Sequence, residues 1–208
     1  MDLFKFINQS NEKQNIYGVV IGIVTNNKDP EGLGRVKVRY PWSGESGESY
    51  WARTMSFMAG KERGAFFLPE VGDEVLIAFE HGDIEHPIVL GALWNGKDKP
   101  PEKNTDGKNN VKKIRSRSGH ELIFNDDKDS GKEKIEIHTA GGHQILLDDS
   151  KGKEKITIKD KSGNIIEIDS VKNEIKIKSS MSISLEAQTI EIKANATLTL
   201  KGGIVKIN

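Results

Sequence analysis

The sequence predicts an all-β chain in which a small barrel is followed by a needle wound from three copies of the chain. Two observations lead to this fold class. Short segments of alternating apolar and polar residues, separated by Gly-rich turns, fill the first half. Pairs of apolar residues one position apart then recur along the second half.

A change in composition divides the 208 residues into four parts. All Trp and Tyr residues lie within 17–95, and Phe124 is the only aromatic residue after Trp94. The stretch NGKDKPPEKNTDGKNN between the halves lacks periodicity and is rich in residues that interrupt regular structure. We therefore predict an N-terminal arm, a barrel, a linker and a needle, at residues 1–16, 17–95, 96–113 and 114–208.

Five strands are expected in the first half. In RVKVRY, for example, Val36, Val38 and Tyr40 alternate with basic residues. No segment of this half has the period of a helix. Short alternating strands at this spacing are typical of a small antiparallel barrel. The expected strands cover 17–24, 35–40, 49–57, 74–80 and 88–94.

The apolar pairs of the second half mark ten short strands whose spacing falls from 13 residues to 7 along the chain. Charged residues fall from 28 in 111–178 to 5 in 179–208, so the element loses its charged loops toward its end. Such narrowing is the pattern expected of a needle. The pairs are Leu122/Phe124, Ile135/Ile137, Ile145/Leu147, Ile156/Ile158, Ile166/Ile168, Ile175/Ile177, Ile183/Leu185, Ile190/Ile192, Leu198/Leu200 and Val205/Ile207.

Three chains are expected because two apolar residues in every seven or eight cannot enclose a core within one chain. If each of three chains gives one strand to a layer, the core closes on a threefold axis and no strand edge stays open. The alternative is a β-solenoid formed by one chain. The similarity of GKEKIEIHT to GKEKITIKD, 21 residues later, supports that alternative.

Charge and composition exclude several other classes. Lys plus Arg and Asp plus Glu both number 31, so no net charge draws the chain to nucleic acid. The absence of Cys excludes disulfides and thiolate metal sites. The N-terminus has neither the basic nor the apolar region of a secretory signal, so we expect synthesis in the cytoplasm. No apolar run reaches the ~20 residues that a membrane-spanning helix needs.

Four segments resemble the spike family of phage baseplate proteins and type VI secretion VgrG proteins. The likeness extends over 16–208 and implies an OB (oligonucleotide/oligosaccharide-binding) barrel followed by an intertwined trimeric β-helix that breaches the target-cell membrane. It implies a structural and mechanical part of a contractile injection apparatus, delivered outside the cell. No enzyme is expected, because the sequence has no Ser-His-Asp spacing, Cys nucleophile or phosphate-binding loop. The segments are GLGRVKVRYPW (32–42), WARTM (51–55), FFLPEVGDEVLIAFEHGDIEHPIVLGALWNGKDKPP (66–101) and SRSGHELIFNDD (116–127).

Departures from that family pattern define the expected partners. VgrG proteins carry a large hub domain before the barrel, whereas about sixteen residues stand there in this sequence. We therefore expect a separate hub protein at the N-terminal end. The linker has no room for the lysozyme domain of some relatives. Other relatives hold iron through a His-x-His pair, which is absent from this sequence, so no cofactor is expected.

The cluster EHGDIEH at 80–86 offers two histidines and three carboxylates as candidate metal ligands. A hydrolytic metal site would need them to converge from rigid elements and leave one coordination position open. Gly and Asp are also ordinary turn residues, and the cluster lies between two expected strands. We interpret it as a turn.

Arg35, Lys37 and Arg39 alternate along one expected strand of the barrel. A basic OB strand beside aromatic residues can bind single-stranded nucleic acid, and OB folds also bind oligosaccharides. This binding role is the alternative function. We predict no nucleic acid, and we expect a binder to expose Tyr40, Trp42 and Trp51, which a spike would bury in the barrel or between subunits.

His120 and His143 share the strand parity of the apolar pairs that follow them. In a trimer each could face the axis in three copies, which would form a three-histidine metal or anion site. The alternative is that both are packed or hydrogen-bonded, and we expect no metal.

Glycines mark two further positions of interest. Gly163, Gly202 and Gly203 occur where turns are shortest, so we expect positive φ at each. The last residues are apolar and poor in charge, which predicts a docking surface. The family resemblance implies a small PAAR-repeat tip protein as its partner. The docking residues are Gly203, Ile204, Val205 and Ile207.

Overall fold

The computed structural model describes residues 15–44 and 47–206, which form two compact units that divide after Pro100. This division lies inside the stretch predicted as a linker, and the predicted domain limits themselves stay a prediction. The described residues are almost entirely strands and loops. No helix among them is long and apolar enough to cross a membrane.

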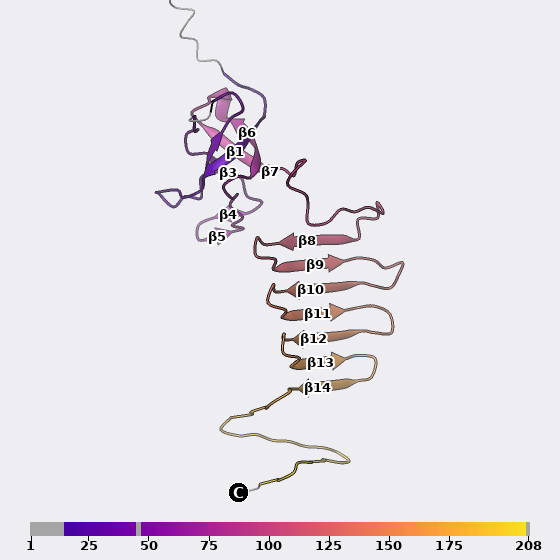
Figure 1. The fold of residues 1–208 in the computed structure, drawn as a ribbon. Coiled ribbons are helices and arrows are strands. Elements are labelled where there is room, and N and C mark those ends of the chain that lie inside the picture. The colour runs from indigo at the N-terminus through magenta and orange to yellow at the C-terminus, as the bar shows by residue number, and fades with distance from the viewer. Residues whose placement is uncertain (1–14, 45–46, 207–208) are drawn as a thin grey trace, which may run out of the picture. The chain divides into compact units, whose positions relative to one another are not determined.

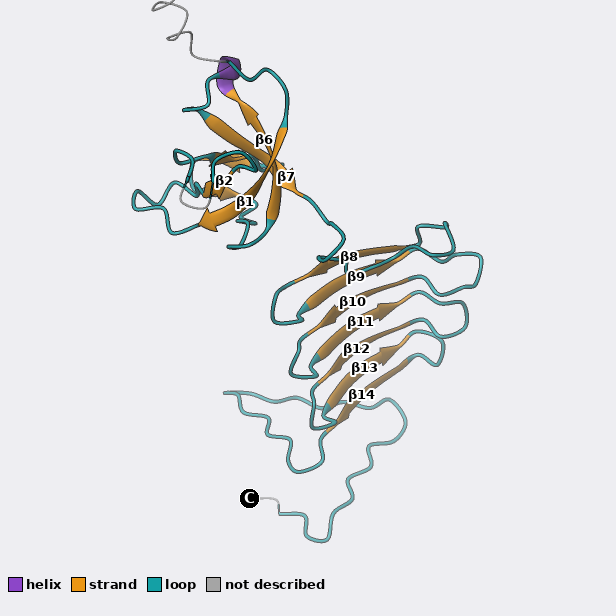
Figure 2. Cartoon of the chain, turned by 45° about the horizontal axis from the view of Figure 1, so that its top comes forward, coloured by secondary structure: helices purple, strands orange, loops and turns teal. Residues whose placement is uncertain are grey.

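The first unit is an OB-like barrel (Figures 1 and 2). Its sheet has the order β2-β1-β6-β7-β3, with antiparallel neighbours except for the parallel pair β3–β7. Backbone hydrogen bonds between Val36 and Ala52 connect the two edges of the sheet. The strands are β1 (Val20–Asn26), β2 (Lys37–Arg39), β3 (Arg53–Thr54), β6 (Glu74–Phe79) and β7 (Pro87–Ala92).

The five predicted strands of this unit all occur, with shifted ends. The third shrinks to two residues because the chain after it turns into a hairpin of β4 (Ala59–Gly60) and β5 (Arg63–Gly64), which the sequence pattern did not indicate. A short 3₁₀ turn, η2 (Glu80–Gly82), connects β6 to β7.

Alternate residues of the barrel strands form its core. They are Val24, Val36, Val38, Tyr40, Ala52, Val75, Ile77, Phe79 and Val89. A Cβ at Gly22 would lie 2.6 Å from Cδ1 of Ile77, so a larger residue there would force the buried Ile77 side chain to shift.

The second unit contains one seven-stranded antiparallel sheet in which every strand pairs with its neighbours in sequence (Figures 1 and 2). Each strand has five residues, and each pair is in register over all five. The strands are β8 (Val111–Arg115), β9 (Glu121–Asn125), β10 (Lys134–His138), β11 (Gln144–Asp148), β12 (Lys155–Lys159), β13 (Ile165–Asp169) and β14 (Glu174–Lys178).

This pairing corrects the prediction that 114–208 is intertwined throughout. Up to Lys178 the hydrogen bonds join strands of one chain, because the connections are long enough to turn the chain back on itself as a hairpin. Within the described part of 179–206 no strand is present. There the apolar pairs follow every seven or eight residues, which leaves room for no more than a very short turn between successive strands. Interchain winding of 179–208 stays a prediction.

Three turns that join successive strands have the same structure. They are residues 116–120, 139–143 and 160–164. In each, the N–H of the first residue donates to the carbonyl of the last, and the side-chain oxygen of the first residue accepts from the N–H of the last. The fourth residue is a glycine with positive φ, which is +86° at Gly163 as predicted. The same expectation is wrong for Gly202 and Gly203, neither of which has positive φ.

Replacing Gly163 with Val should destabilise the second unit by at least about 1–2 kcal/mol per chain, since an L residue is disfavoured at positive φ. No neighbouring atom lies within 4 Å of the new Cβ, so the cost comes from the backbone alone. Thermal melts followed by circular dichroism measure the effect. Ser162→Val, one residue earlier at an ordinary φ, is the matched control. Equal melting temperatures for the two variants would show that this turn is not as described.

Candidate functional site

One face of the sheet β8–β14 carries two parallel columns of apolar side chains. Strand register places these residues directly opposite one another on successive strands. Most of them are between 38% and 57% exposed, and Ile175 at the last strand is 72% exposed. The first column is Ile114, Leu122, Ile137, Ile145, Ile158, Ile166 and Ile177. The second is Phe124, Ile135, Leu147, Ile156, Ile168 and Ile175.

The opposite face is mostly polar, apart from Val111, Ile123, Leu146 and Ile165, and in its middle strands it is less exposed than the apolar face. Lys134, Asp148, Lys155 and Asp169 stand opposite one another and alternate in charge, which stabilises neighbouring strands. Partial burial alone would raise the pKa of Asp148. Hydrogen bonds from Ser150 and the charges of the two lysines nevertheless hold that pKa below its ordinary value.

Glu136 lies at the centre of this polar face and is almost covered. Burial alone would raise the pKa of its carboxylate, but contacts with Lys134 and His138 lower it. The sheet therefore satisfies its charges within one chain and leaves its apolar side chains open. An antiparallel sheet normally packs its apolar face against a core, so this face is the principal candidate for an interaction surface.

The predicted axial histidines lie in turns rather than within strands. His120 and His143 are the last residues of two of the three turns described above. Nδ1 of His120 accepts a hydrogen bond from the backbone N–H of Ala140 in the next turn. Asn164 holds the equivalent place in the third turn, and its side-chain oxygen accepts from the N–H of Ser180. A hydrogen-bonding role is therefore observed for His120, whereas an ion on the axis stays untested.

The EHGDIEH cluster forms η2 and the turn into β7, as interpreted from the sequence. Asp83 caps this turn by accepting hydrogen bonds from the N–H of Glu85 and from the ring of His86. Glu80 points to Arg53, 2.8 Å away. Within the part of the chain that the structure describes, no three potential ligands converge as a metal would require.

Acidic residues pair with two of the three cations on the basic strand. Arg35 contacts Asp29 and Glu31, and Lys37 contacts Glu48. The same two cations lie over the ring of Trp51, at 5.9 and 5.5 Å. These pairs reduce the positive charge that a nucleic acid would meet.

The three aromatic residues chosen as indicators differ in exposure. Tyr40 is buried in the barrel core, and burial raises its pKa to about 12. Trp51 is half-buried. Trp42 stacks on Tyr40 with 5.1 Å between ring centroids and is 52% exposed.

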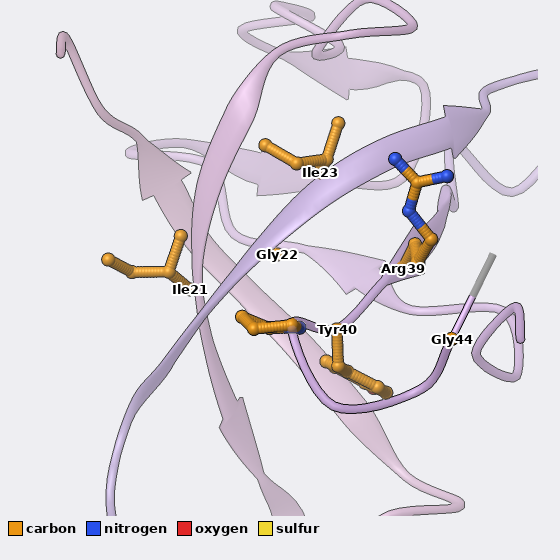
Figure 3. A pocket seen from close by; sticks show the side chains of 7 residues that line it. Ile21, Gly22, Ile23, Arg39, Tyr40 and Gly44 are labelled. Carbon is orange, nitrogen blue, oxygen red and sulfur yellow. The ribbon is translucent and has the colours of Figure 1, made fainter. Parts of the chain in front are cut away.

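An open groove of about 730 Å³ runs along the outer side of β1 (Figure 3). Ile21 and Ile23 form one wall, and Arg39, Tyr40 and Pro41 at the end of β2 form the other. Its lining is mostly apolar, with one guanidinium at the rim. No pattern in the sequence singled out this groove, because β1 is apolar on both faces and was interpreted only as a barrel strand.

The predicted docking residues at the C-terminal end are exposed where they are described. Ile204 and Val205 are largely accessible and follow Gly203 in a segment without strands. Ile207 lies outside the described residues, as does most of the arm predicted at 1–16. The docking role of these residues stays a prediction.

Asp29 organises the loop that joins β1 to β2. Its carboxylate accepts hydrogen bonds from the backbone N–H groups of Glu31, Leu33 and Arg35 and from the Arg35 guanidinium. The Arg35 hydrogen bond is the largest cause of a pKa for Asp29 that lies far below its ordinary value. The loop is thereby fixed beside Trp51.

Asp29→Asn should lower the melting temperature of the barrel at pH 7, since the amide cannot reproduce the pairing with Arg35. The lowered pKa of Asp29 in the folded state means that this stabilisation is present above pH ~4. It is lost progressively as the pH falls toward the folded-state pKa. Melting curves at pH 7 and pH 3 measure the effect, and the difference between wild type and variant should shrink at pH 3. A constant difference would contradict the role given to the charge.

The fold and its surfaces define a class of protein with an OB-like barrel joined to a β-sheet unit that exposes one apolar face. Residues 20–94 match the family described as the type VI secretion system/phage-baseplate injector OB domain. The match covers the barrel sheet from the start of β1 to just beyond the end of β7.

Three relatives extend this likeness beyond the barrel. The actin cross-linking toxin VgrG1 of Vibrio cholerae is 30% identical over 126 residues, covering 57% of this chain and 11% of the toxin. The spike protein VgrG3 of the same species is 31% identical over 126 residues, covering 57% and 12%. The spike protein VgrG1a of Pseudomonas aeruginosa is 30% identical over 126 residues, covering 55% and 19%.

Residues 20–94 belong to this injector OB-domain family, and the chain is similar over somewhat more than half of its length to VgrG spike proteins. The matched region is less than a fifth of the length of each of these three relatives.

Proposed function

We propose that this chain is the central spike of a contractile injection apparatus, such as a phage tail, a tailocin, an extracellular injection system or a type VI secretion machine. The observation that carries the proposal is the apolar face of the sheet β8–β14, which one chain leaves open. In a parallel homotrimer three such faces meet on a common axis and bury one another. The names of the relatives, which include type VI secretion spike proteins, support this role.

The segment after β14 supports a trimer rather than a dimer. The described part of 179–206 has no strand pairing of its own, yet its apolar pairs continue at steps of seven or eight residues. Three chains that each supply one short strand per layer would satisfy these backbone groups and enclose the apolar residues. A face-to-face dimer would cover the sheets but would leave this segment without a closed ring of partners.

Such a trimer works by stiffness rather than by catalysis. Each sheet of the proposed prism is a continuous ladder of hydrogen bonds, and the apolar columns bind the three ladders together. The alternating charges remain on the outer surface and keep the rod soluble. When a sheath contracts, the rod transmits the force to the target-cell membrane, a task that needs no active site.

Other proteins would hold the two ends of the chain. A separate hub protein would take the OB end, with residues 1–16 against it, and a PAAR-repeat protein would cover the C-terminal end. The complete particle would carry the spike out of the cell in which it was made.

Ile158→Asp should dissociate the trimer, since it places an unpaired carboxylate against the axis in three copies. An uncompensated buried charge costs about 3–5 kcal/mol, so we expect association to weaken by at least ~100-fold. Lys159→Asp introduces the same charge at the next residue, on the opposite face, and should leave the trimer intact. Sedimentation velocity at matched concentrations compares the two. If both variants sediment like the wild type, the apolar face is not the interface.

Ile204→Asp tests the C-terminal docking surface while leaving the sheet unchanged. It should abolish binding of the trimer to a PAAR-repeat protein encoded by a neighbouring gene, because a charge would replace an exposed apolar contact. Lys201→Asp, three residues earlier, is the control and should bind as the wild type does. Biolayer interferometry gives both affinities. Equal binding by the two variants would show that the end is not a docking surface.

A further inference from the structure

The outer face of the barrel strands is apolar. Ile21 pairs with Leu76 across β1 and β6, and Ala78 pairs with Ile88 across β6 and β7, all on the side away from the core. Strands that are apolar on both faces are usually covered on both. Ile21 also lines the groove beside β1, so this outer face is hollowed at one edge (Figure 3).

The hairpin β4–β5 and its flanks carry a second set of exposed apolar side chains that lie close together in sequence, here called the hairpin patch. Phe57, Phe66 and Phe67 are 85%, 77% and 65% exposed, and Met55 and Met58 lie beside them in sequence with more than half of their surface open. An aromatic side chain carries roughly 200 Å², so the three phenylalanines alone expose on the order of 450 Å². A stable interface takes about 800 Å² from each partner, so this patch can supply a large share of one.

Hydrogen bonds hold the hairpin patch in shape before any partner binds. The carbonyl of Met58 accepts from the N–H of Ala65 and from the hydroxyl of Ser56. The Ser56 hydroxyl also lies 2.8 Å from the carbonyl of Ala65. Preorganised aromatic side chains that fill a pocket are the usual anchors of a protein interface.

We infer that the hairpin patch of one chain packs into the β1 groove of the next chain in the trimer. A ring with threefold symmetry needs two different, complementary surfaces on every subunit, because each contact is heterologous. The barrel provides such a pair: exposed phenylalanines and a partly apolar groove of about 730 Å³, which is large enough to admit aromatic side chains. Arg39 at the groove rim adds a cation that can lie over a phenylalanine ring.

This contact rests on the proposed trimer and would give the barrels a ring of their own, independent of the sheet. It also explains why the two apolar surfaces of the barrel differ in shape. A self-complementary dimer contact would require only one surface, repeated on both partners.

Cysteine crosslinking tests the contact directly, since the chain has no native Cys. Ile21→Cys and Phe67→Cys are made separately in chains with different tags, which are then co-expressed and treated with a short bismaleimide. We expect covalent dimers that carry both tags to be the main product. Each single variant alone should give none, because identical positions do not meet in a heterologous ring. Lys28→Cys in place of Ile21→Cys is the matched exposed control and should not crosslink to Phe67→Cys.

Light scattering on the same samples separates the possible failures. A mass of three chains without mixed-tag crosslinks would overturn this contact and leave the proposed spike intact. Covalent dimers from either single variant would also overturn it, since they indicate a self-complementary contact. A mass of one chain would contradict the proposed trimer itself.

Discussion

Two columns of branched apolar side chains on the sheet β8–β14 lie open to water in the single chain, and the other features of this unit follow from their need for a cover. Completing the burial of each half-exposed side chain is worth on the order of 1 kcal/mol. Some dozen residues in each of three chains make this a large driving force for association. The charged residues opposite them are already paired within the chain and need no partner.

The lengths of the connections determine how the backbone groups are satisfied. Up to Lys178 each chain pairs its own strands, so in the proposed trimer the three sheets would be held together by side chains. Beyond Lys178 the repeat leaves room for only a very short turn, and in the proposed trimer the backbone groups there would pair with other chains. The proposed spike therefore changes from three packed sheets to three wound chains along its length, and its charged loops disappear at the same point in the sequence.

The alternation of apolar and polar residues was sufficient to predict the barrel strands and the apolar pairs, because it shows which face of each strand is apolar. Alternation does not say which strand is the hydrogen-bonded neighbour, so the in-chain pairing of 111–178 was missed. The strand parity of His120 predicted that it faces the threefold axis, whereas the structure places it at the end of a hydrogen-bonded turn. The β1 groove and the phenylalanine hairpin were also missed, since their surfaces arise from the fold and leave no periodic signal.

The average mass of the wild-type protein in solution tests the central claim most directly, namely that the apolar sheet face is an interface between three copies. Multi-angle light scattering at micromolar concentration, with circular dichroism on the same sample, should give three times the 23.1 kDa mass of one chain together with a β-rich spectrum. A folded monomer of 23.1 kDa would contradict the account, because the apolar face would then be stable in water without a partner.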